Sequence, residues 1–168
     1  MLWLAPANAS AETNLRREAA ARGINPGRLV FAKRMPSSAE HLARLRLADL
    51  FLDTLPYNAH ATAADALWAG LPVLTRIGET FAGRVAASVL NAVGLPELVT
   101  TTAESYERTA VDLANHPEKL AAIKCKLAEN RLSSPLFDTE LFTRHIEAAY
   151  RVMYDRYQLG LPPDHIAV

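Results

Sequence analysis

A polar loop between an apolar run and a helical stretch holds the residues best suited to bind a ligand. After the apolar run 50–52, residues 53–65 read DTLPYNAHATAAD. The first N–H groups of a helix have no acceptor within it, and the helix dipole is positive there, so this position favours an anion such as phosphate. His60 and Thr62 add side-chain donors, while alanines at 59, 61 and 63 leave the backbone accessible. The loop therefore predicts a phosphate-binding site.

Asp65 follows Thr62 by three residues, so both side chains project from one side of the predicted helix start. A carboxylate at this place could hold the hydroxyls of a ribose. The same pair also fits a purely structural role, because Thr-x-x-Asp resembles a capping box and an acid suits the positive end of the dipole. The residue pattern alone leaves both interpretations open.

A second loop, 33–44, leads from an apolar run into another predicted helix. His41 and Arg44 in it are three residues apart and can face one point. An imidazole and a guanidinium so placed could together contact a nucleobase. The alternative is an ordinary solvated helix face.

Composition excludes several function classes. The 168 residues contain 18 basic and 18 acidic side chains, and this balance argues against a nucleic-acid or membrane partner. A single cysteine excludes an internal disulfide framework and a multi-cysteine zinc site. Apolar runs are too short to span a bilayer, and the N-terminus lacks the basic region of a signal peptide. We expect a soluble, cytoplasmic globular domain.

Short apolar strands alternate with single helices along the chain, a pattern typical of a parallel sheet covered on both faces. This predicts an α/β, Rossmann-like fold with a helical C-terminal end, with one domain over 1–160 and a tail over 161–168. Trp68 is expected in the core, and Ser10 and either Ser37 or Ser38 are expected to cap helices. The expected strands are 2–5, 28–32, 50–53, 72–75 and 98–100, and the expected helices are 10–22, 37–47, 61–69, 79–93, 103–115, 117–131 and 138–157.

The central motif resembles a known family. Residues 47–88 read LADLFLDTLPYNAHATAADALWAGLPVLTRIGETFAGRVAAS. This closely resembles the pattern of the O-GlcNAc transferase (SPINDLY-type) family, and the segments 2–4, 23–31, 40–44 and 131–157 fit as well. The resemblance covers almost the whole chain.

The resemblance implies the C-terminal, donor-binding lobe of a two-lobed GT-B glycosyltransferase. The family transfers GlcNAc from UDP-GlcNAc to Ser or Thr hydroxyls of proteins, with inversion and without a metal or other cofactor. By position, the resemblance implies that His60, Ala61 and Thr62 contact the diphosphate and sugar, and that Tyr57 lies near the sugar. It also implies that Asp65 holds the ribose and that His41 and Arg44 contact the uracil.

The chain also departs from the family pattern. Ser38 stands where the family often has lysine, and Ala61 where it often has threonine. The family's phosphate-binding lysine, its acceptor lobe with the catalytic groups and its TPR repeats have no counterpart here, so the catalytic residues are unknown and we expect the chain alone to be inactive. A strand that starts at residue 2 leaves an open sheet edge, which predicts a homodimer. Two alternatives stay open, a non-catalytic module that binds a nucleotide or a subunit, and a related enzyme that uses another UDP-sugar.

Overall fold

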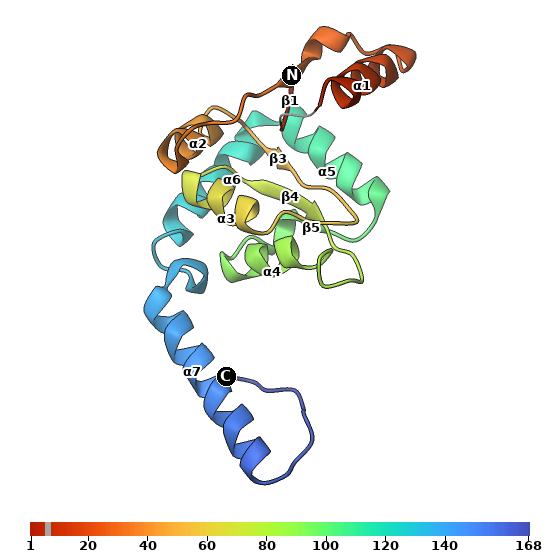
Figure 1. The fold of residues 1–168 in the computed structure, drawn as a ribbon. Helices are drawn as coiled ribbons and strands as arrows, with labels where there is room; N and C mark the ends of the chain where they lie inside the picture. Colours follow the sequence, from red (N-terminus) through yellow and green to blue (C-terminus); the bar gives the residue numbers. More distant parts are fainter. Residues whose placement is uncertain (6–7) are drawn as a thin grey trace. The chain divides into compact units, whose positions relative to one another are not determined.

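A computed structural model describes residues 1–5 and 8–168 of the chain. The chain forms two compact units, Met1–His41 and Leu42–Val168, which are described separately below. Figure 1 shows the elements of both units in chain order.

The first unit is a β-α-β arrangement. Strands β1 (Leu2–Leu4) and β2 (Leu29–Phe31) pair in parallel and form a two-stranded sheet. Helix α1 (Ala9–Ala21) and the short 3-10 helix η1 (Pro26–Arg28) connect them. Both strands are shorter than the sequence pattern predicts, but their order and the helix between them agree with it.

The cap of α1 differs from the predicted one. The side chain of Asn8, and not of Ser10, accepts a hydrogen bond from the N–H of Ala11 at 2.8 Å. Asn and Ser are comparable caps, so the pattern could not separate two candidates only two residues apart. Gly23, with φ of +72°, follows the end of the helix as expected.

Helix α2 (Ser38–Leu45) continues from the first unit into the second. Ser37 caps it, as one of the two predicted alternatives. Its hydroxyl accepts the Glu40 N–H at 3.3 Å, and the Glu40 carboxylate accepts the Ser37 N–H at 3.2 Å. This reciprocal pair is a capping box.

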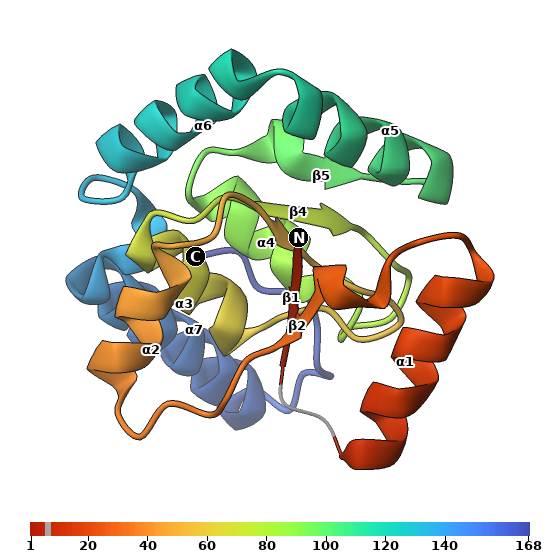
Figure 2. The same cartoon turned by 90° about the horizontal axis from the view of Figure 1, so that it is seen from above.

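The second unit is built on a three-stranded parallel sheet in the order β3-β4-β5, with strands Phe51–Leu52, Val73–Arg76 and Val99–Thr100. Helices α3 (Ala61–Ala69) and α4 (Val85–Ala92) pack against β4 from one side. Helix α5 (Ala103–Asn115) packs against it from the other side (Figures 1 and 2). The predicted parallel sheet with helices on both faces is therefore confirmed for this unit.

The remaining elements of this unit are mainly helical, as predicted. Helix α5 (Ala103–Asn115) and helix α6 (Pro117–Asn130) lie close to the predicted bounds, as does α7 (Thr139–Gln158). The short 3-10 helices η2 and η3 span Pro96–Leu98 and Pro135–Phe137. The tail after α7 has no regular secondary structure.

The core lies between the sheet and its helices. Its largest fully buried side chains come from α3, β4, α4 and α6 and from the loops between them: Leu67, Leu71, Val73, Leu74, Leu90, Val93, Leu95, Leu98 and Leu127. Trp68 is an exception to the prediction, because 44% of it is exposed. Its ring lies against Phe137 and under the Arg131 guanidinium, so it covers the edge of the core.

The helix predicted from residue 79 begins only at Val85, with Arg84 as its N-cap. Residues 78–83 form a closed loop instead. The Gly78 N–H donates to the Gly83 carbonyl at 2.7 Å, and the Gly83 N–H donates to the Thr80 carbonyl at 3.1 Å. These local bonds, together with the bond from the Asn58 N–H to the Ala82 carbonyl at 2.9 Å, override the helical pattern of the segment.

Gly94, which follows α4, lies in close contact with Asn130 at the end of α6. It has φ of +76°, and a Cβ there would lie 2.7 Å from the Asn130 amide nitrogen, which donates to the Val93 carbonyl. Gly70 has φ of +87° but only an ordinary contact of 3.8 Å between the position of a Cβ and Arg131.

Alanine at Gly94 or at Gly70 should cost about 1–2 kcal/mol of stability for the left-handed backbone. Gly94→Ala should cost about 1 kcal/mol more than Gly70→Ala in urea unfolding, because it also breaks a hydrogen bond. Equal losses would contradict this reading.

Candidate functional site

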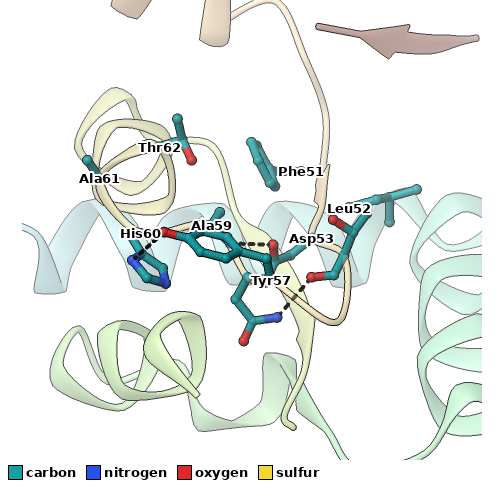
Figure 3. A pocket seen from close by; sticks show the side chains of 10 residues that line it. Phe51, Leu52, Asp53, Tyr57, Ala59, His60, Ala61 and Thr62 are labelled. Atoms are coloured by element: carbon teal, nitrogen blue, oxygen red, sulfur yellow. Dashed lines mark hydrogen bonds between the residues drawn. The ribbon is translucent and has the colours of Figure 1, made fainter. Parts of the chain in front are cut away.

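A cavity of about 420 Å³ lies at the carboxyl end of β3, where the chain passes into α3 (Figure 3). This is the place at which open parallel sheets bind their ligands. The lining comes from β3, the loop that follows it and the first two residues of α3: Phe51, Leu52, Asp53, Thr54, Tyr57, Asn58, Ala59, His60, Ala61 and Thr62.

The buried carboxylate of Asp53 shapes this loop. Only 5% of the residue is exposed. One oxygen accepts the N–H of Ala59 at 2.7 Å, and the other accepts the Thr75 hydroxyl of β4 at 2.6 Å. A buried carboxylate is stable only when its oxygens are satisfied in this way. These two bonds hold the residues before α3 against the sheet.

Tyr106 of α5 stabilises the backbone at Asp53. Its hydroxyl donates to the Asp53 carbonyl at 2.7 Å. Burial, and then the negative charge of Asp53, raise the pKa of Tyr106 to about 12. The hydroxyl therefore stays protonated and remains a donor.

Asn58 closes the loop. The residue is buried, and its N–H donates to the Ala82 carbonyl at 2.9 Å. Its side-chain amide donates to the carbonyls of Thr54 and Arg76 at 3.1 and 3.4 Å. The loop 53–60 is thus joined to β4 and to the loop 78–83.

The N-terminus of α3 offers backbone donors to the cavity. His60 is the N-cap and its side chain makes no capping bond. Its carbonyl accepts the N–H groups of Ala63 and Ala64. Within residues 1–5 and 8–168, no acceptor is found for the N–H of Ala61 or of Thr62. This is the arrangement that favours an anion.

The structural alternative for Thr62 and Asp65 is wrong. A capping box needs their side chains at the N-cap and at the third helical position, but α3 already starts at Ala61. Thr62 is exposed and lines the cavity, whereas Asp65 is half-buried one turn further along α3 and outside the lining. In the described part of the chain, neither side chain has a hydrogen-bond partner.

Tyr57 and His60 line the cavity with their rings, and Phe81 lies next to His60. The rings of Tyr57 and His60 are stacked, with centroids 4.7 Å apart and planes inclined by 19°. Phe81, from the loop 78–83, meets His60 edge-on at 6.1 Å. Tyr57 is 65% exposed and presents apolar surface at the cavity, whereas Phe81, 82% exposed, lies outside the lining.

The structure therefore brings together Tyr57, His60, Ala61 and Thr62 of the predicted site residues. His41 and Arg44 both lie on α2, and their predicted contact with a nucleobase stays a prediction. Asp53, Asn58 and Tyr106 were not predicted from the sequence to have a role at the site. For Asp53 a signal existed, since an acid at the end of a buried strand needs partners. No signal in the sequence indicated the role of Tyr106, because its partner Asp53 is 53 residues away along the chain.

Comparison with known proteins identifies the class. The sequence profile described as Glycosyl transferase family 41 matches residues 1–146. The chain belongs to this family.

Individual relatives agree with that assignment. The chain is 39% identical over 166 residues to a UDP-N-acetylglucosamine–peptide N-acetylglucosaminyltransferase from Caenorhabditis elegans. The aligned region covers 99% of this chain and 14% of the relative. A probable enzyme of the same name, SEC of Arabidopsis thaliana, is 39% identical over 168 residues, which is 17% of its length. The solved structure of a Thermobaculum terrenum O-GlcNAc transferase mutant matches with a TM-score of 0.86 and 35% identity, over 95% of this chain and 31% of that one. The predicted fold and family are confirmed, and the chain spans about one sixth or less of these two curated relatives.

The described residues lack a membrane-spanning helix and a metal-binding cluster. No helix among them is long and apolar enough to cross a membrane. In the same residues no group of three or more His, Cys, Asp or Glu side chains could hold a metal ion.

Asp53→Ala should lower the free energy of unfolding by about 3 kcal/mol, because it leaves the Ala59 N–H and the Thr75 hydroxyl without an acceptor. Asp53→Asn should cost less, because the amide can accept from Ala59 and donate to Thr75. Asp49→Ala, an exposed acid just before β3, is the control and should change stability by less than about 0.5 kcal/mol. Urea unfolding measures all three. Equal effects at 53 and 49 would refute the role given to Asp53.

The raised pKa of Tyr106 predicts a loss of stability at alkaline pH. The unfolded side chain ionises near its ordinary value of 10 and the folded one near 12, so its contribution is complete below about pH 10 and is lost as the pH rises through 12. Of the five tyrosines, one should titrate last in an ultraviolet titration. Tyr106→Phe should remove that step and Tyr154→Phe, on exposed α7 surface, should not. A late step that survives in Tyr106→Phe would contradict the assignment.

Proposed function

We propose that the cavity binds the diphosphate and sugar of UDP-GlcNAc, and that the chain is the donor-binding part of a protein O-GlcNAc transferase. The observation that carries the proposal is a pair of N–H groups, on Ala61 and Thr62, that have no acceptor among the described residues and lie at a cavity beside the positive end of α3. The names of the relatives support the donor and a peptide acceptor.

The geometry suits a leaving diphosphate. Negative charge grows on UDP as the glycosidic bond breaks, and fixed N–H dipoles can stabilise it without reorganising. The bonds of Asp53 hold the first turn of α3 in place before any ligand arrives. The Thr62 hydroxyl adds a donor, and we propose that no metal is needed.

The roles implied by the family resemblance complete the proposal. Asp65 would hold the ribose, His41 and Arg44 the uracil, and Tyr57 would lie near the sugar. Transfer to Ser or Thr with inversion would need an acceptor site and catalytic groups from another part of the protein. The proposed place of action is the cytoplasm.

Binding of UDP tests the donor site directly. Calorimetry should show UDP binding to the chain, weakened about fivefold to tenfold by Thr62→Val, which removes one hydroxyl at constant shape. Asp65→Ala should weaken it by more than about tenfold, because a charged acceptor for the ribose is lost. Asp155→Ala, on the exposed surface of α7, is the matched control and should leave affinity unchanged.

Three outcomes separate the alternatives. No UDP binding to the chain would overturn the donor site. UDP binding without any transfer of sugar to Ser- or Thr-containing peptides by the whole protein would favour a non-catalytic nucleotide-binding module. Tighter competition by UDP-glucose than by UDP-GlcNAc would indicate a related enzyme with another donor.

A further inference from the structure

Both ring nitrogens of His60 have a neighbour in the structure. Nδ1 lies 3.5 Å from the Tyr57 hydroxyl, and Nε2 lies 3.4 Å from the Ala82 carbonyl oxygen. The Tyr57 ring also lies flat against the imidazole (Figure 3). The orientation of His60 is therefore set by one residue of its own loop and one of the loop 78–83.

The chemistry of these neighbours selects one tautomer. A carbonyl oxygen only accepts hydrogen bonds, so Nε2 must carry the proton that faces Ala82. In a neutral imidazole Nδ1 is then an acceptor, and the Tyr57 hydroxyl must donate to it. The opposite tautomer would place two lone pairs against each other at Ala82.

The Ala82 carbonyl is itself held firmly. It also accepts the Asn58 N–H at 2.9 Å. Next to it, Gly83 approaches so closely that a Cβ would lie 3.3 Å from the Pro56 carbonyl oxygen and 3.3 Å from the Gly78 Cα. The two loops are packed in contact here, so the acceptor cannot easily turn away from His60.

We propose that Tyr57 is a positioning residue that, with the Ala82 carbonyl, holds His60 as the Nε2–H tautomer with its ring fixed beside the N-terminus of α3. The tautomer is inferred from the two contacts of the ring, at 3.5 Å and 3.4 Å. Its consequence for binding rests on the proposed function: Nε2–H is the one imidazole donor, and a phosphate oxygen would compete for it with the Ala82 carbonyl.

Nitrogen-15 NMR of the histidine rings tests the tautomer without any ligand, under alkaline conditions at which imidazoles are neutral. The chain has five histidines, and the signals that disappear in His60→Gln identify this one. We expect a protonated Nε2 and an unprotonated Nδ1. In Tyr57→Phe, which keeps the stacked ring but lacks the hydroxyl, the two shifts should move toward a mixture of tautomers. Tyr154→Phe is the control and should change nothing. Tyr57 is exposed, so the variant should fold.

A protonated Nδ1 in the unmodified chain, or unchanged shifts in Tyr57→Phe, would overturn the proposal. Calorimetry with UDP is the second arm. If the hydroxyl keeps the binding-competent tautomer populated, its loss should lower UDP affinity about twofold when the two tautomers become equally populated. Unchanged affinity with altered tautomers would refute the link to binding. Absence of UDP binding in every variant would refute the proposed function, while the spectra would still decide the tautomer.

Discussion

The buried carboxylate of Asp53 is the interaction on which the site depends. It ends β3, accepts from the backbone of Ala59 and from the Thr75 side chain, and so ties the start of α3 to the neighbouring strand. Burying a charge is costly unless it is fully paired, and both oxygens are paired here. Its own carbonyl is held in turn by Tyr106 from α5. One residue thus joins the sheet, the ligand-binding loop and the helix layer on the other face.

A second constraint follows from the first. The loop 78–83 packs onto the loop 53–60, and the missing side chains of Gly78 and Gly83 favour this close contact, since a Cβ would lie 3.2 Å from Leu55 Cδ2 and 3.3 Å from the Pro56 carbonyl oxygen. The Ala82 carbonyl lies near both Asn58 and His60. In the proposed anion site the donors are the N–H groups of Ala61 and Thr62 at the start of α3, and the cavity lining contains no lysine or arginine.

Local signals predicted much of this fold. The bounds of α3 and α5 agree with the prediction, because a glycine ends the first and a Thr-x-x-Ser capping box starts the second. The predicted start of α4 at residue 79 was wrong. Residues 79–84 have a helical pattern, but contacts with residues distant in sequence bend them into a loop. The residue types also predict a phosphate-binding role for the start of α3, and this role stays a prediction. The support from Tyr106 could not, because only the folded chain brings it to Asp53.

The departure at Ala61 shows why the site tolerates changes in its side chains. Where the family often has threonine, alanine removes a hydroxyl, yet the N–H of this residue still lies at the helix N-terminus without an acceptor in the described chain. The donor that an anion meets there belongs to the backbone, and its direction is set by the helix and by the bonds of Asp53 rather than by the side chain at 61. Asp53 and Asn58 line the cavity themselves, and their bonds to Ala59, Thr75, Thr54 and Arg76 set the course of the loop that leads into α3. The direction of the backbone donors therefore depends on these two residues and not on the side chain at position 61.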